Sequence, residues 1–217
     1  MLPGGPGVGP PASGRLRVLR ALKKLSMTES RSTEHKGWYS RNYLPHSDSA
    51  EMVRHIVFRT IGSLPQDVAR TLPEDARAVR KLIEELLDCG EHGHELIDDF
   101  SRQTVEGALL HGDGRRYRLL AWCVMPSHVH VLIEQMQGFP LAQVVRAWKS
   151  FTALQINRAR GRTGSFWARD FFDRYMRNED QIWRAISYIE GNPVKARLVV
   201  AAADWPFSPA RLERTLQ

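Results

Sequence analysis

Cysteine and long apolar runs are both scarce in this sequence of 217 residues. Its two cysteines, Cys89 and Cys123, argue against a disulfide scaffold and a thiolate metal site, so we expect a reducing, intracellular setting. No run of about 18 apolar residues occurs, and the sequence therefore predicts no membrane-spanning helix. Apolar residues make up 42% and charged residues 25% of the chain, which is typical of one globular domain with a core.

Positive charge is unevenly distributed. The formal net charge is +7, from 31 Lys and Arg against 24 Asp and Glu. Residues 1–50 carry 8 basic and 3 acidic groups, residues 51–110 carry 7 and 12, and residues 111–217 carry 16 and 9, so the net charges are +5, −5 and +7. Clustered Lys and Arg gain free energy by releasing counterions from phosphates. The second half therefore favours a polyanionic partner, although a solvated basic face gives the same count.

The first 36 residues read as an extension. Residues 1–14 are rich in Gly and Pro, and residues 15–26 carry five basic and no acidic side chains. We interpret residues 1–36 as a disordered basic extension or as the result of a start assigned upstream of Met27. A targeting peptide is a further interpretation, but a secretory signal would need a longer apolar stretch after its charges. A single domain is expected over residues 37–217.

Three segments are expected to be strands. Val53–Ile61 is rich in β-branched and apolar residues. The segments Tyr117–Val124 and His128–Glu134 are separated by three residues that include Pro126, which predicts an antiparallel hairpin with the proline in its turn. A further short extended piece is expected within residues 165–177.

Three segments are expected to be helices. Apolar residues recur at three- and four-residue spacing over residues 72–87 and again from Leu141 to about Arg158. A third helix is expected from the N-cap Asn178 through Ile189, ended by Gly191 and Pro193. The alternation of elements predicts an α+β fold, a ferredoxin-like sandwich with helices on one face of a small antiparallel sheet.

The motif His128-Val129-His130 lies within the second strand of the predicted hairpin. Side chains alternate between the faces of a strand, so both imidazoles should point the same way and could bind one divalent cation. An isolated pair of this kind is also compatible with two polar residues on a solvent-facing sheet surface. Two histidines rarely complete a metal site, so further ligands would be a side-chain oxygen, water or substrate.

The third helix offers such an oxygen. Asn192 follows Tyr188 by four residues, a spacing at which two side chains share one helical face. A tyrosine at such a position more often packs on a sheet, and an asparagine before a proline more often caps a helix. The spacing alone leaves both interpretations open.

Four runs of sequence together resemble a known family. The run AWCVMPSHVHVLIE is similar to the metal-binding strand of the HUH single-tyrosine transposases, in which two histidines flank one hydrophobic residue. The later runs FWARDFFDRYMRNEDQIWRAISYIEGNPVKARLV and DWPFSPA, together with the upstream GWYSRNYLPH, resemble the REP-associated branch of that family. The resemblance covers roughly residues 37–210.

The resemblance implies a function and a site. It places the two metal ligands at His128 and His130, the nucleophile at Tyr188 and a third polar ligand at Asn192. The implied activity is cleavage and transfer of single-stranded DNA next to REP-type hairpins, through a covalent 5′-phosphotyrosine, with Mg²⁺ or Mn²⁺. A cytoplasmic, nucleoid-associated protein is expected, and whether it forms a homodimer stays open.

One stretch departs from the family pattern. The acidic segment Glu84–Glu106 also holds His92 and His94. Their spacing suggests a second metal site, but Gly90, Gly93 and the local acidity favour a flexible loop.

DNA contacts are expected from basic residues in the second half, with Phe166, Trp167, Phe171 and Phe172 interspersed to stack on bases. The alternative is that these aromatics are core and the basic residues are solvated. The candidates are Arg146, Lys149, Arg158, Arg160, Arg169 and Arg174, with Arg162, Arg177 and Arg184 nearby.

Two other function classes compete with the enzyme. A catalytically inactive or domesticated DNA-binding protein would keep the basic surface without cutting. A zinc hydrolase built on the His-x-His pair is disfavoured, because the chain is short for a barrel of about 250 residues and lacks Cys-x-x-Cys and His-Glu-x-x-His motifs.

Overall fold

The computed structural model describes residues 37–41, 44–48, 52–64, 76–88, 93 and 95–212. The predicted extension 1–36, Cys89 and the pair His92 and His94 lie outside these residues. None of the described helices is long and apolar enough to cross a bilayer.

A four-stranded antiparallel sheet forms the centre of the molecule. Its strands are β3 (Val53–Thr60), β4 (Tyr117–Val124), β5 (His128–Gln135) and β6 (Trp167–Tyr175), in the order β4-β5-β3-β6. All neighbouring pairs are antiparallel, and the first strand lies between the third and the fourth, as in a ferredoxin-like fold. The predicted α+β fold class is therefore confirmed.

One extended segment is longer than the sequence pattern indicates, and one hairpin was not predicted. The predicted short piece before the third helix is the nine-residue strand β6, which pairs with β3 at one edge of the sheet. The segment after residue 36 forms a separate hairpin of β1 (Gly37–Arg41) and β2 (Leu44–Asp48), and β2 lies beside β6.

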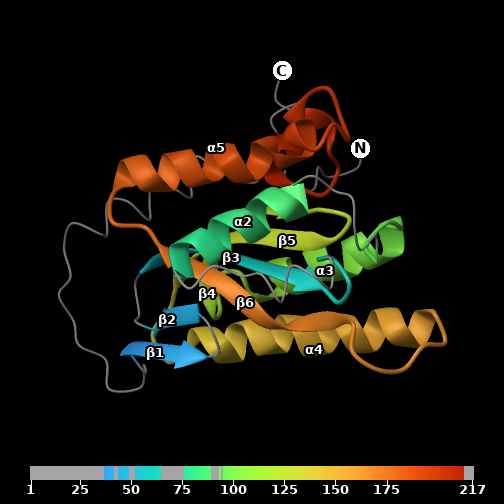
Figure 1. Cartoon of the computed structure of the whole chain (residues 1–217), viewed down its shortest axis with the longest axis horizontal. Coiled ribbons are helices and arrows are strands. Elements are labelled where there is room, and N and C mark those ends of the chain that lie inside the picture. The colour runs from blue at the N-terminus through green and yellow to red at the C-terminus, as the bar shows by residue number, and fades with distance from the viewer. Residues whose placement is uncertain are drawn as a thin grey trace, which may run out of the picture.

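Helices cover both faces of the sheet, so the expectation of helices on one face only is wrong. Figure 1 shows α5 (Glu179–Lys195) along one side of the sheet and α4 (Leu141–Ala159) along the other. Helix α3 (Asp99–Gly112) packs beside α4, whereas α2 (Ala76–Asp88) buries Ile83 and Leu87 on the α5 side.

Helix α3 corrects the interpretation of Glu84–Glu106 as a flexible loop. The end of α2 and the first half of α3 both lie in this stretch. The side chain of Asp98 accepts a hydrogen bond from the backbone N–H of Ser101 at 2.8 Å, which is the capping chemistry that acidic residues supply at a helix N-terminus. Val105 and Leu109 then bury the inner face of the helix in the core. The acidic residues around position 98 therefore belong to the start of a helix and not to a flexible loop.

Helix α5 corrects a second expectation. It does not end at Gly191 but runs through Pro193 to Lys195. Asn192 and Pro193 are both buried, so packing on the sheet outweighs the hydrogen bond that the proline removes. The backbone N–H of Ala196 then bonds to the Asn192 carbonyl at 2.9 Å and closes the last turn.

Candidate active site

The two histidines of β5 meet on the sheet face that α5 covers. Their Nε2 atoms lie 2.9 Å apart, and both side chains are inaccessible to solvent, with exposed fractions of 1% for His128 and 0% for His130. The prediction that both point the same way is confirmed. Because they are buried, the interpretation as polar residues on a solvent-facing sheet surface is wrong.

Each histidine has a partner on its other ring nitrogen. The hydroxyl of Ser127 lies 3.0 Å from Nδ1 of His128. On the neighbouring strand β3, Nε2 of His55 lies 3.1 Å from Nδ1 of His130, and the two rings stack with centroids 5.3 Å apart. Hydrogen bonds of this kind fix the tautomer and the orientation of an imidazole, so both Nε2 atoms face one common point.

His55 is a site residue that could not be identified from the sequence pattern. It lies in the strand that the sequence predicts, at a position whose side chain alternates with Ile56 between the faces. Its contact with His130 depends on the register of β3 against β5, which places Val57 opposite His130. A histidine inside a buried strand was the available signal, but its partner could not be read from the sequence.

Tyr188 reaches the histidines from α5. Its ring centroid lies 5.6 Å from that of His130 and 5.9 Å from that of His55, with both ring pairs close to perpendicular. The structure therefore brings together the phenol and the imidazoles that lie far apart in the sequence.

Asn192 lies one turn after Tyr188 on the same helix. Its side-chain N–H donates to the Tyr188 carbonyl at 2.9 Å, and only 1% of the residue is exposed. Its Oδ1 is buried and has no hydrogen-bond partner. A buried carbonyl without a partner is costly, and such an atom calls for a functional explanation.

Burial decides the charge of the two histidines. It lowers the pKa of His128 to about 3. It also lowers the pKa of His130 well below its ordinary value, with further contributions from His128, His55 and Lys195. Both imidazoles are therefore neutral at neutral pH, which is the form that can bind a cation.

The comparison with protein families covers this site. Residues 110–192 match the family described as IS200-like transposases, and this segment contains both histidines, Tyr188 and Asn192. This segment of the chain is therefore similar to the IS200-like transposases.

The chain is also similar to individual proteins described as REP-associated tyrosine transposases. A Haemophilus influenzae protein described as a REP-associated tyrosine transposase is 26% identical over 102 residues, which cover 42% of this chain and 58% of that relative. The chain thus matches a little more than half the length of this relative. A solved structure of a REP-associated tyrosine transposase bound to a REP hairpin has the same fold, with a TM-score of 0.53, 19% identity and 88% of each chain covered.

The donor atoms of the site fit a divalent cation. Two neutral imidazole nitrogens converge, and one buried amide oxygen on the facing helix has no partner. Across the residues that the structure describes, no three or more His, Cys, Asp or Glu residues form a metal cluster. A cation held here would complete its shell with oxygen from the amide, water or substrate.

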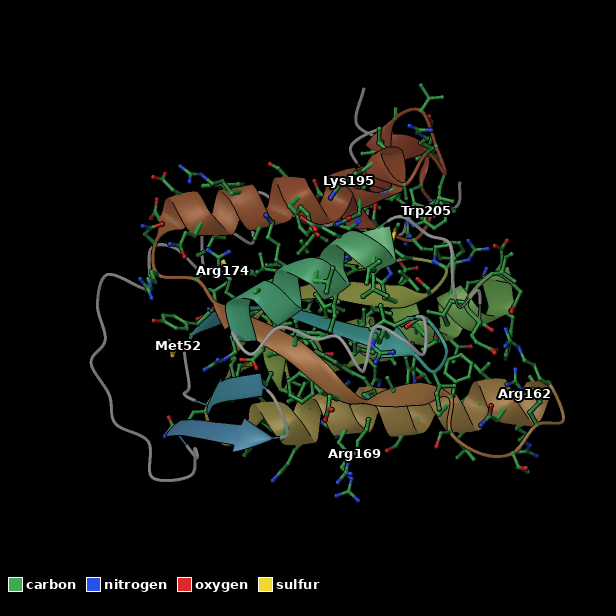
Figure 2. The ribbon with its side chains drawn as sticks, viewed as in Figure 1. Met52, Arg162, Arg169, Arg174, Lys195 and Trp205 are labelled. Carbon is green, nitrogen blue, oxygen red and sulfur yellow. The ribbon has the colours of Figure 1, made fainter. Side chains whose placement is uncertain are left out.

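The basic residues predicted from the sequence to bind DNA do not share one surface. Arg146, Lys149 and Arg169 line a hollow of about 400 Å³ between α4 and β6, on the sheet face opposite the histidines. The register of β6 places Arg174 opposite His55, on the histidine face. Figure 2 shows Arg169 and Arg162 near α4, and Arg174 on the α5 side of the molecule.

Some of these side chains have structural partners. Lys149 donates to the carbonyls of Ala168 and Arg169 at 2.6 and 2.9 Å, which ties α4 to β6. Arg160 pairs with Glu95 and Asp98 and thereby joins the end of α4 to the start of α3. Arg158 lies exposed near the end of α4. Lys149 and Arg160 thus hold elements together whatever they do toward DNA.

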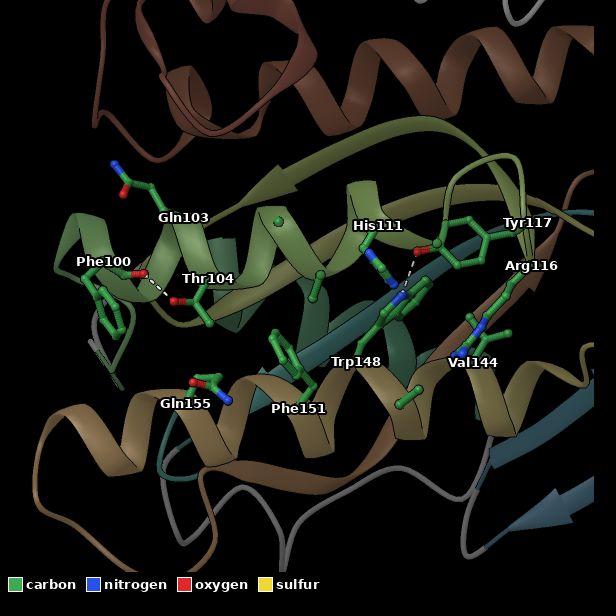
Figure 3. Close-up of a pocket in the computed structure, with 14 residues that line it drawn as sticks. Phe100, Gln103, Thr104, His111, Arg116, Tyr117, Val144, Trp148, Phe151 and Gln155 are labelled. Atoms are coloured by element: carbon green, nitrogen blue, oxygen red, sulfur yellow. Dashed lines mark hydrogen bonds between the residues drawn. The ribbon is translucent and has the colours of Figure 1, made fainter.

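A second hollow lies away from the histidines. It measures about 600 Å³ and is lined by α3 and α4, with Trp148 and Phe151 among its side chains. In Figure 3 the hydroxyl of Tyr117 bonds to the indole of Trp148 at the inner end of this hollow. The sheet separates it from the histidines, so it is not part of the candidate active site.

Proposed function

We propose that this domain cuts and rejoins single-stranded DNA beside REP-type hairpins, with Tyr188 as the nucleophile and a divalent cation as cofactor. The observation that carries this proposal is the arrangement of two imidazoles and one phenol around one point. His128 and His130 present their Nε2 atoms, and the ring of Tyr188 lies within 6 Å of the ring of His130.

The proposed reaction conserves the energy of the phosphodiester. The phenol oxygen of Tyr188 forms a bond to phosphorus as the bond to the 3′ oxygen breaks, which leaves a 5′-phosphotyrosine and a free 3′-hydroxyl. The phenol loses one proton and the 3′ oxygen gains one, so no water or co-substrate is consumed. Attack by another 3′-hydroxyl reverses the step and transfers the strand.

His128, His130 and the Oδ1 of Asn192 would hold Mg²⁺ or Mn²⁺. Such an ion supplies polarisation of the phosphoryl oxygen and support for the leaving 3′ oxygen, because a phenol with an ordinary pKa near 10 is a weak nucleophile at neutral pH. Ser127 and His55 would keep both imidazoles turned toward the ion. The neutrality of the histidines leaves their lone pairs available without a proton to displace.

Hairpin DNA is the substrate that the comparison with the solved REP-hairpin complex favours. Arg174 lies on the histidine face and would contact the DNA strand near the cleaved phosphate. Arg146 and Arg169 lie on the opposite face and would contact phosphates farther from the cleaved one. A protein with this activity would work on the nucleoid in the cytoplasm. A homodimer is not needed for the site as described.

The direct test is covalent trapping on a hairpin oligonucleotide with Mn²⁺. Tyr188→Phe should abolish the protein–DNA adduct while hairpin binding persists. The matched control is Tyr175→Phe, because Tyr175 is the last residue of β6 and its hydroxyl accepts a hydrogen bond from Arg177 at 3.2 Å. An adduct in the Tyr188→Phe protein would assign the nucleophile elsewhere. A wild-type protein that binds hairpins and forms no adduct would be a DNA-binding module.

A further inference from the structure

Lys195 lies on the same side of α5 as the candidate nucleophile. Seven residues separate it from Tyr188, which is close to two helical turns. Its ammonium nitrogen lies 5.6 Å from the centroid of the Tyr188 ring.

The charge of Lys195 reaches the buried histidines. It contributes to the lowered pKa of His130, after burial and the neighbouring His128 and His55. The geometry agrees, because the ammonium lies 5.6 Å from the centroid of the Tyr188 ring and that centroid lies 5.6 Å from the centroid of the His130 ring, although the lysine itself is exposed to solvent. It is within reach both of the site and of a ligand arriving from solution.

A positive side chain near the phenol would act together with the proposed divalent ion. His128 and His130 are neutral and the Asn192 amide is uncharged, so these side chains bring no positive charge of their own to a phosphodiester. An anion next to buried groups gains from each compensating charge. Lys195 would supply such a charge beside the Tyr188 ring.

A structural role for Lys195 is the main alternative. A lysine in the last turn of a helix stabilises the helix dipole. That role requires only a positive charge near the end of α5, and it predicts no dependence on the charge of the DNA linkage at Tyr188.

We propose that Lys195 is a further catalytic residue, whose ammonium binds a nonbridging oxygen of the phosphodiester that Tyr188 attacks. This inference rests on the proposed function. The ammonium keeps its proton throughout, and it stabilises the negative charge on the phosphoryl oxygens as the bond to Tyr188 forms. The balance of bonds and protons in the reaction is therefore unchanged.

The first experiment measures adduct formation at saturating hairpin DNA. Lys195→Met keeps an unbranched apolar stem over the Tyr188 ring and removes the charge. We expect the single-turnover rate to fall about 100-fold to 1,000-fold, the usual effect of removing one donor that stabilises transition-state charge. Arg197→Gln is the matched control, because it removes one positive charge two residues further along the exposed chain. It should leave this rate within about twofold.

The second experiment does not depend on cleavage. In a Tyr188→Phe background, binding is measured to the same hairpin with a normal linkage and with a neutral methylphosphonate at the position that the wild-type protein cuts. With Lys195 present, the neutral linkage should weaken binding about tenfold or more, the worth of a hydrogen bond to a charged group. With Met at this position, most of that penalty should disappear, which is the coupling that a double-mutant cycle isolates.

The outcomes separate the two proposals. If Lys195→Met cuts as fast as wild type, or if the penalty for the neutral linkage is the same with Lys and with Met, Lys195 does not touch this phosphate. An equal loss of rate in Arg197→Gln would reduce the effect to general charge and also overturn the inference. If the wild-type protein forms no adduct, or Tyr188→Phe still forms one, the proposed function fails instead.

Discussion

The two faces of the sheet bury polar groups in different ways. On the α3 and α4 face, the hydroxyl of Tyr117 donates to the Leu109 carbonyl at 2.6 Å and accepts from Trp148 at 2.8 Å. On the same face, Glu106 accepts from the indole of Trp122 and pairs with Arg211. The polar atoms of these two groups have partners, and burial raises the pKa of Tyr117 so that its phenol stays a neutral donor. Elsewhere on α3, Nε of Arg102 is buried without a hydrogen-bond partner, but its guanidinium lies over the rings of Trp205 and Phe207.

On the α5 face the arrangement is less favourable to folding. Two imidazoles are fully buried, and the Oδ1 of Asn192 has no partner. Unpartnered buried oxygen costs about 1–3 kcal/mol, a loss that selection for stability alone would remove. We infer that the α3 and α4 face serves stability and that the α5 face serves the proposed chemistry, as is common where function opposes stability.

The largest expected effect is at the histidine pair. His128→Ala should lower metal-dependent adduct formation more than about 1,000-fold, because several kcal/mol of charge stabilisation by a bound ion would be lost. The measurement is a Mn²⁺ titration of the adduct rate. An unchanged metal response would exclude His128 as a ligand, and the α5 face would then no longer be explained by metal chemistry.

The matching change on the other face should act on stability alone. Leu109→Ala removes a fully buried side chain from the core between α3 and the sheet, and it should lower the free energy of unfolding by about 2–5 kcal/mol. Urea denaturation measures this loss. The adduct rate per folded molecule should stay within about twofold, and a large drop would show that the two faces are not independent.

A smaller effect is expected at His55. His55→Leu removes the acceptor for Nδ1–H of His130, and the loss of such an orienting partner typically costs about 10–100-fold in metal affinity. His55→Gln keeps a side-chain oxygen and should recover most of that affinity. Calorimetric titration with Mn²⁺ measures both variants without any DNA. Equal affinity in the Leu and Gln proteins would mean that His55 only fills space.

Much of this division between faces could be predicted from the sequence. The alternation in β5 predicts that His128 and His130 share a face, because this pattern is local. The four-residue spacing of Tyr188 and Asn192 is compatible with a shared helical face but leaves it open, since the helix is expected to end at Gly191. The contact of His55 with His130 could not be predicted, since it depends on strand register across 75 residues. Local rules also failed at Pro193, where burial of the end of α5 outweighs the helix-breaking tendency of proline.

The smallest expected effect concerns Oδ1 of Asn192, which has no hydrogen-bond partner. Asn192→Leu has nearly the same shape, removes the unpartnered Oδ1 and gives up one hydrogen bond to the Tyr188 carbonyl. Removal of the unpartnered oxygen should raise the free energy of unfolding by about 1–3 kcal/mol, and loss of the hydrogen bond should lower it by about 1 kcal/mol. Without metal, the free energy of unfolding should therefore rise by about 1 kcal/mol. In the wild type, Mn²⁺ should raise the melting temperature, because a ligand of the folded state alone stabilises it, whereas the Leu variant should gain much less from the ion. Urea and thermal denaturation with and without Mn²⁺ measure both effects. A variant that is destabilised without metal, yet keeps its full response to Mn²⁺, would show that Asn192 serves packing on the α5 face and that the third ligand lies elsewhere.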